Sequence, residues 1–272
     1  MQQPFSLSGK TIVVTGGTGV LGYTFNKAIA AAGANVVIVG RNKQKAEERA
    51  HEISSNGGNA IGLAVDVTKL DELEAAKTTI LSHFPNIDGL VNAAGGNMSG
   101  AIVQPSGDIF ELDIQALKDV MDLNLFGTIL PTQVFGKAML TNNKKGSIVN
   151  ISSVSAHKAL TRVLGYSLAK SAIESYTKWF AVESAKRYRD RLRFNAIVPG
   201  FFLTEQNRTL LTNEDGSLTS RGQDINRQTP FNRFGQPEEL SGALVWLLSD
   251  ASAFVNGTSI IVDGGFLANS GV

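Results

Sequence analysis

A tyrosine and a lysine four residues apart are the side chains in this sequence with the clearest chemical potential. Tyr166 and Lys170 share one face of any helix that includes both, because residues four apart are neighbours on a helix. A nearby ammonium favours the phenolate, which moves the pKa of a tyrosine from near 10 toward neutrality and lets the phenol act as a general acid or base. Ser153 lies thirteen residues before Tyr166, at the end of an apolar run, where its hydroxyl could hydrogen-bond a reacting oxygen. The spacing predicts proton transfer at a carbonyl or an alcohol.

A glycine-rich stretch near the amino end has the spacing of a dinucleotide-binding turn. Gly17, Gly19 and Gly22 match G-x-G-x-x-G, with a predicted strand before them and a predicted helix after them. Such glycines let backbone N–H groups approach a pyrophosphate, and the helix adds positive potential at its amino end. The predicted cofactor contacts here are Gly16, Gly17, Thr18, Gly19, Val20, Leu21 and Gly22.

The ends of the next predicted strands supply further cofactor candidates. The second strand ends in Val-Gly-Arg-Asn, with Arg41 and Asn42 where an NAD-preferring site usually offers an acid to the ribose. An arginine there can pair with a 2′-phosphate, so we expect NADP(H) to be favoured and NAD(H) to be possible. The third and fourth strands end at two groups of candidates, Asp66 with Val67, and Asn92, Ala93, Ala94 and Gly95.

These residues must be positioned by alternating strands and helices. Short apolar runs predict strands at 11–15, 35–39, 60–65, 89–92, 147–151, 192–198 and 259–262, and helical patterns fall between them, including 113–140 and 164–187. Strands that are apolar throughout belong in a parallel sheet covered by helices on both faces. The sequence predicts a single-domain Rossmann fold over residues 1–272, with about seven strands and a polar substrate lid at 201–235.

Composition narrows the classes of function. The 272 residues carry 25 Lys+Arg against 24 Asp+Glu, so no global field attracts nucleic acid or an anionic membrane surface. No cysteine is present, which excludes thiolate chemistry and cysteine-based metal sites, and we expect no metal. No stretch reaches the length of a membrane span and the first residues lack a targeting pattern, so we expect a cytoplasmic protein.

The motifs together resemble the short-chain dehydrogenase/reductase family over nearly the whole chain. The matching positions, in order, are residues 15–22, 92–95, Asn124, Ser153, Tyr166, Lys170, Pro199 with Gly200 and Thr204, and 262–265. One departure concerns the first turn, where Gly16, Gly19 and Gly22 have the spacing of the extended branch that modifies sugar nucleotides. The length of 272 residues leaves no room for the additional domain of that branch.

The resemblance implies roles for these residues. Tyr166 is the general acid/base, Lys170 lowers its pKa and holds the nicotinamide ribose, Ser153 orients the substrate, and Asn124 supports a proton relay through water to the lysine. Pro199, Gly200, Phe202 and Thr204 border the cofactor. The family also implies a homotetramer, whose two-fold contacts use the helices expected at 113–140 and 164–187.

The segments at 199–235 and 265–272 resemble the D-mannonate oxidoreductase branch, also called fructuronate reductase. A sugar acid needs a cation for its carboxylate and polar partners for its hydroxyls. The candidate substrate residues are Ser153, Asn97, Arg162, Gln206, Asn207 and Arg208, with Arg208 the first choice for the carboxylate. The alternatives are a polyol or gluconate-type dehydrogenase, a 3-oxoacyl thioester reductase, and a catalytically idle nucleotide-sensing protein.

Overall fold

Seven parallel strands form one sheet in the order β3-β2-β1-β4-β5-β6-β7. The structure is a computed structural model that describes residues 4–142, 144–204 and 207–271. Strands β1, β4, β5 and β6 are buried along their whole length, as expected for apolar runs covered on both faces. The prediction of a doubly wound parallel sheet is confirmed. The strands are β1 Thr11–Thr15, β2 Asn35–Gly40, β3 Asn59–Ala64, β4 Gly89–Asn92, β5 Gly146–Ile151, β6 Leu192–Pro199 and β7 Ser259–Val262.

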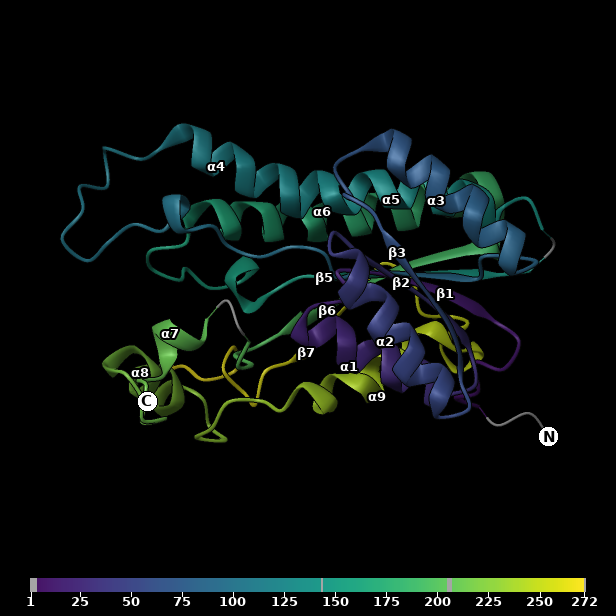
Figure 1. Ribbon diagram of the computed structural model, residues 1–272. Coiled ribbons are helices and arrows are strands. Elements are labelled where there is room, and N and C mark those ends of the chain that lie inside the picture. The colour runs from purple at the N-terminus through teal and green to yellow at the C-terminus, as the bar shows by residue number, and fades with distance from the viewer. Residues whose placement is uncertain (1–3, 143, 205–206, 272) are drawn as a thin grey trace.

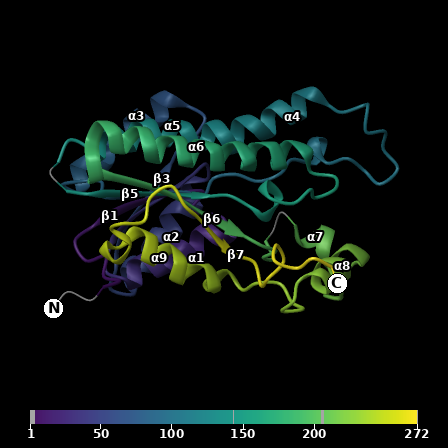
Figure 2. The same cartoon turned by 180° about the vertical axis from the view of Figure 1, so that it is seen from behind.

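Helices cover both faces of the sheet (Figures 1 and 2). Neighbouring strand residues point to opposite faces, so Val14 packs in the core on one face and Val13 in the core on the other. The first face is covered by α1 (Val20–Ala31), α2 (Lys43–Ser55) and α9 (Ser241–Leu248). The second is covered by α3 (Leu70–His83), α4 (Ile114–Met121), α5 (Gly127–Met139) and α6 (Leu164–Tyr188).

The single helix expected at 113–140 is interrupted. A π-helical turn at Asp122–Phe126 separates α4 from α5. Such turns are rare and are often found at functional sites. Asn124 lies inside this one and is fully buried.

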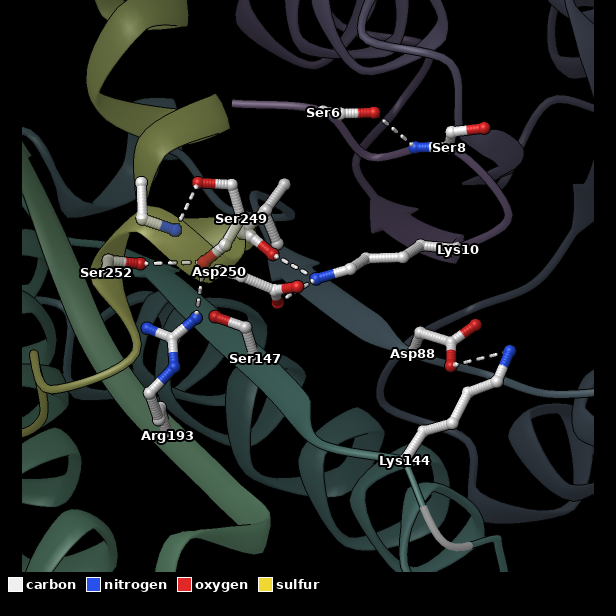
Figure 3. Close-up of polar contacts among 12 residues, drawn as sticks. Ser6, Ser8, Lys10, Asp88, Lys144, Ser147, Arg193, Ser249, Asp250 and Ser252 are labelled. Carbon is white, nitrogen blue, oxygen red and sulfur yellow. Dashed lines mark hydrogen bonds and ion pairs between the residues drawn. The ribbon is translucent and has the colours of Figure 1, made fainter. Parts of the chain in front are cut away.

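Polar contacts close the amino-terminal edge of the sheet (Figure 3). The Lys10 ammonium lies 2.7 Å from a carboxylate oxygen of Asp250, and the buried guanidinium of Arg193 donates to the Leu247 and Ser249 carbonyls at 2.8 and 3.1 Å. These contacts tie the starts of β1 and β6 to the last turn of α9 and to the chain that follows it. The candidate site residues lie at the opposite edge.

The segment expected to be a polar lid contains two short helices, α7 (Arg208–Leu211) and α8 (Ser220–Gln228). Its base is closed by a hydrogen bond from the Gly235 N–H to the Phe201 carbonyl. Leu211, Ile225 and Phe234 form a small apolar core inside this segment. Its polar residues therefore surround a buried apolar interior. Within the part of the chain that the structure describes, no helix is both long and apolar enough to cross a membrane.

Candidate active site

The turn between β1 and α1 brings backbone segments so close together that glycine is required at two positions. Gly16 has a φ of +64°, and a Cβ there would lie 2.6 Å from the Ala93 carbonyl oxygen. A Cβ on Gly22 would lie 2.2 Å from the Gly16 carbonyl oxygen, so only glycine lets the helix start this close to the turn. Gly19 is the N-cap of α1 and offers no side-chain cap. The first N–H groups of α1 are therefore free of a capping side chain and suit a phosphate group.

The end of β2 carries no acid. Arg41 is exposed, and the Thr18 side chain occupies the space where a Cβ on Gly40 would be. The Asn42 side chain accepts a hydrogen bond from the Lys45 N–H and caps α2, so its amide oxygen already has a local partner. At the end of β2 the exposed guanidinium of Arg41 therefore faces no acid from its own strand, although its charge acts on Asp66 at the end of the next strand.

Asp66 belongs to the same neighbourhood. Partial burial raises the pKa of its carboxyl, but hydrogen bonds from the Thr68 N–H and hydroxyl and the charge of Arg41 outweigh that effect, so the pKa is lowered overall. Asp66 therefore remains a carboxylate at neutral pH. Val67, which follows it, is buried and packs against Gly127.

Asn92 is used inside the protein. Its amide donates to the Thr132 hydroxyl at 2.9 Å and to the Asn150 side chain at 2.8 Å, which links β4 to α5 and β5. The next two N–H groups, of Ala93 and Ala94, donate to the Thr15 hydroxyl. The Asn92 side-chain N–H groups are therefore used inside the protein, whereas its buried Oδ1 has no hydrogen-bond partner among the described residues.

The π-helical turn holds the loop after β4. The Asn124 amide donates to the Gly96 and Val120 carbonyls at 2.7 and 2.8 Å and accepts from the Gly96 N–H at 3.0 Å. Gly95 has a φ of +157°, and a Cβ there would lie 2.5 Å from the Asn124 amide oxygen. Asn124 therefore fixes the backbone at Gly95 and Gly96 beside Lys170.

Ser153, Tyr166 and Lys170 meet at the ends of β5 and α6. Ser153 caps the short turn after β5, with its hydroxyl accepting from the Ser155 N–H at 3.2 Å. The Ser153 hydroxyl also acts on the Tyr166 phenol, whose pKa it lowers. The Lys170 ammonium donates to the Ile151 carbonyl at 2.8 Å and lies 5.4 Å from the centroid of the Tyr166 ring. The three side chains predicted to share one chemistry are thus brought together.

The pKa values differ from the expectation. Burial raises the pKa of the Tyr166 phenol, and its hydrogen bond with Ser153 opposes this only in part. Burial also lowers the pKa of Lys170 to about 8. The expected lowering of the tyrosine pKa by the lysine is therefore wrong, because desolvation destabilises the charged forms of both groups.

Glu174 completes this region and was missed from the sequence. It is buried one turn after Lys170, and its carboxylate contacts the Ser152 hydroxyl at 2.8 Å, the His157 Nε2 at 2.7 Å and the Ser259 hydroxyl at 3.1 Å. It thereby ties the residue before Ser153 to α6 and β7. The repeat of polar residues at Tyr166, Lys170 and Glu174 is the signal, since positions i, i+4 and i+8 share a helix face.

The turn after β6 forms another wall of the region. A Cβ on Gly200 would lie 2.7 Å from the Asp263 Cα, so the chain after β7 packs directly on this turn. Pro199 ends β6 and Phe202 is buried. The Thr204 N–H donates to the Asn207 side chain, whose amide donates in turn to the Phe202 carbonyl. Asn207 therefore closes a loop, and its amide has two backbone partners.

The other candidate substrate residues differ in their surroundings. The Asn97 side chain accepts from the Met98 N–H, Arg162 is anchored on Val103 and Gln104, and Arg208 is exposed on α7. Gln206 lies outside the described residues. Among residues 4–142, 144–204 and 207–271, no three His, Asp or Glu side chains are placed to hold a metal ion.

Comparisons with known proteins agree with this geometry. A family model described as enoyl-(acyl carrier protein) reductase matches residues 19–267. An uncharacterized oxidoreductase, UxuB of Bacillus subtilis, is 43% identical over 98% of both chains. A solved structure of a candidate D-mannonate oxidoreductase from Haemophilus influenzae with bound NAD is 39% identical, covers 98% of both chains and has a TM-score of 0.91.

A more distant structure also covers nearly the whole chain. The gluconate 5-dehydrogenase of Burkholderia cenocepacia, in complex with NADP and tartrate, is 31% identical, covers 97% of this chain and 98% of its own, and has a TM-score of 0.86. Three findings indicate the same family: the glycine turn, the cluster of Ser153, Tyr166 and Lys170, and these full-length similarities. The chain belongs to the short-chain dehydrogenase/reductase family and is an NAD(P)-dependent oxidoreductase that acts on CH–OH groups.

Proposed function

We propose that the enzyme interconverts a keto sugar acid and its hydroxy acid, with D-fructuronate and D-mannonate as the pair. The observation that carries this proposal is the full-length similarity to the candidate D-mannonate oxidoreductase, with Ser153, Tyr166 and Lys170 clustered here. The tartrate bound to the gluconate 5-dehydrogenase supports a hydroxylated anion as the ligand class. A gluconate-type dehydrogenase is the second candidate, supported by the same structure.

The chain's own residues account for the proton transfer. A bound nicotinamide cofactor supplies the hydride for the carbonyl carbon or accepts it from the alcohol. In the direction of reduction, the Tyr166 phenol donates its proton to the carbonyl oxygen while the Ser153 hydroxyl hydrogen-bonds the same oxygen. The high pKa of the phenol keeps it protonated at neutral pH, which suits this direction.

Lys170 and Asn124 support that step. With a pKa of about 8, the Lys170 ammonium is mostly protonated at pH 7 and stabilises negative charge that develops on the phenol oxygen. Asn124 holds the backbone at Gly96 near that ammonium and, in this proposal, takes part in the proton relay.

The cofactor contacts follow the carboxyl ends of the strands. The glycine turn holds the pyrophosphate and Arg41 pairs with a 2′-phosphate, so NADP(H) is favoured and NAD(H) is accepted. We assign the cofactor to Gly16, Gly17, Thr18, Gly19, Val20, Leu21, Gly22, Arg41, Asn42, Asp66, Val67, Asn92, Ala93, Ala94, Gly95, Tyr166, Lys170, Pro199, Gly200, Phe202 and Thr204. The substrate would contact Ser153, Asn97 and Arg162, with Asn207 and Arg208 from the lid.

The same proposal includes a homotetramer. On α6, Leu168, Trp179 and Val182 are exposed large apolar residues, and Ile114 and Phe126 are exposed at α4 and the π-helical turn. Apolar side chains repeated along one layer of helices favour coverage by a second copy. The cytoplasmic location stays a prediction from the sequence.

The experiment that tests the function is a cofactor-absorbance screen. Purified enzyme is assayed with C5 and C6 sugar acids and their neutral polyols or ketoses, each with NAD(H) and NADP(H). We expect the highest kcat/KM with a keto hexonate such as D-fructuronate. Activity confined to neutral ketoses or acyl thioesters would reject the substrate proposal and leave the family assignment in place.

A further inference from the structure

Two arginines from different segments converge at one loop. Arg162 lies in the loop before α6, where its Nε donates to the Val103 carbonyl at 3.0 Å and its Nη2 to the Gln104 side chain at 3.2 Å. Arg221 lies in the first turn of α8 and donates to the Thr161 hydroxyl and carbonyl at 3.2 and 3.3 Å. Arg221 therefore links the lid to the residue next to Arg162.

The two guanidinium groups have neutral partners. Each has five N–H donors and uses two in these contacts, so three remain on each. Within the described part of the chain, no carboxylate forms an ion pair with Arg162 or Arg221, whereas Arg227 pairs with Asp224 and Arg233 with Glu239. Arg162 and Arg221 thus form a pair of cations that no carboxylate of the described residues neutralises.

Their surroundings concentrate positive potential. Burial lowers the pKa of Arg221, and the charge of Arg162 lowers it further, which shows that the two groups repel. Arg221 also lies at the amino end of α8, whose first turn contains no acid, so the helix dipole adds positive potential. One anion near both groups would remove this repulsion and form charge-assisted hydrogen bonds with N–H donors that remain.

The backbone also marks this loop. Arg162 has a φ of +78°, a conformation that costs a non-glycine residue of order 1–3 kcal/mol and is often found at functional sites. It lies four residues before Tyr166, at the start of the helix that carries the proton donor. In Figure 1, α7 and α8 lie at the same end of the molecule as the start of α6.

We propose that Arg162 and Arg221 together bind the carboxylate of the substrate, and that Arg221 draws the lid helix α8 onto the bound anion. This inference rests on the proposed sugar-acid function. It assigns the substrate carboxylate to Arg162 and Arg221, which join the lid to the helix that carries Tyr166, instead of to Arg208, which is exposed on α7. The lid then closes over a sugar acid more tightly than over a neutral sugar, because the neutral sugar offers no charge to Arg221.

The test compares D-fructuronate with D-fructose, in which a hydroxymethyl group replaces the carboxylate. Steady-state rates with NADPH are measured for Arg162→Ala, Arg221→Ala and the double variant. The loss of a charged hydrogen bond, about 1.5–3 kcal/mol or somewhat more when buried, raises KM for D-fructuronate by about 10- to 1000-fold in each single variant. The kcat/KM for D-fructose should change by less than about threefold. The double variant should lose less than the product of the two single losses, because both arginines serve one carboxylate.

Matched variants separate this proposal from its alternatives. Arg227 lies on the same helix but is paired with Asp224, so Arg227→Ala should leave the KM and kcat/KM for both substrates unchanged. Arg162→Lys and Arg221→Lys keep the positive charge, so they test the site even if an alanine variant misfolds. Their KM for D-fructuronate should rise less than that of the alanine variants. A rise in KM confined to Arg208→Ala, with Arg162→Ala and Arg221→Ala unaffected, overturns the proposal. A wild-type enzyme that ignores every uronate instead overturns the proposed function itself, and this inference with it.

Discussion

Replacement of Lys170 by methionine should stabilise the protein at neutral pH. The gain in stability over the wild type should shrink as the pH rises. Lys170 is buried, and burial lowers its pKa from 10.5 to about 8. At 1.36 kcal/mol per pKa unit, the buried ammonium destabilises the folded chain at pH 7 by roughly 3 kcal/mol relative to a neutral group. Methionine has a similar length and avoids this penalty, but it loses the hydrogen bond to the Ile151 carbonyl, worth about 1 kcal/mol. The expected net gain at pH 7 is about 1–2 kcal/mol.

The direction of the pH dependence follows from the same pKa. Between pH 8 and 10.5 the unfolded chain keeps the lysine proton while the folded chain has released it, so the unfolded state binds more protons. The stability of the wild type therefore rises with pH across this window. Lys170→Met lacks this rise, so its advantage should disappear by about pH 10, where the penalty on the wild type has fallen below about 1 kcal/mol.

The assay is urea unfolding of the cofactor-free wild type and variant at pH 7 and pH 10. At each pH, the free energy of unfolding of the wild type is subtracted from that of the variant. This difference cancels the contribution of groups that titrate alike in both proteins. The exposed Lys43→Met is the matched control and should show little change with pH, since its ion pair with Glu47 is at the surface. Equal stability differences at both pH values for Lys170→Met would show that burial does not penalise the ammonium.

Three further outcomes are expected. Tyr166→Phe should keep the fold and cofactor binding but lower kcat by at least about 10²-fold, because the phenol supplies the proton; near-normal turnover would remove Tyr166 from its role. Arg41→Ala should raise the KM for NADPH far more than that for NADH in absorbance assays, since only NADPH has the 2′-phosphate; equal effects would make Arg41 an ordinary surface residue. Light scattering at micromolar concentration should give the mass of a tetramer, and Trp179→Glu on the exposed face of α6 should reduce it; a wild-type monomer would contradict the assembly.

The sheet was predictable because its signal is local. Runs such as residues 11–15 and 147–151 are rich in β-branched residues and do not alternate with charged ones, and this pattern favours strands that are buried on both faces. The clustering of Ser153, Tyr166 and Lys170 was predictable for a related reason. Strand ends converge at one edge of such a sheet, and a four-residue spacing fixes a helix face.

Other features depend on packing and had no local signal. No residue type marks the π-helical turn around Asn124, so the segment was expected to be one continuous helix. The pKa of Lys170 depends on how deeply α6 buries it. Asparagine serves equally as a cap, a loop closure or a ligand, and the structure uses the side chains of Asn42 and Asn207 locally. Arg162 and Arg221 are 59 positions apart in the sequence. They come together because Arg221 donates to Thr161, the residue before Arg162.

The central claim is hydride transfer to a sugar-acid carbonyl, and an isotope experiment tests it most directly. The enzyme is incubated with D-fructuronate and NADPH that carries deuterium on the transferring face at C4 of the nicotinamide, and the product is analysed by mass spectrometry and NMR. The account predicts D-mannonate one mass unit heavier than the unlabelled acid, with the deuterium on the carbon that bore the ketone, and no labelled product from Tyr166→Phe above about one hundredth of the wild-type rate. Deuterium that stays in the cofactor with D-fructuronate but appears in a neutral alcohol or an acyl thioester when those substrates are supplied would contradict it.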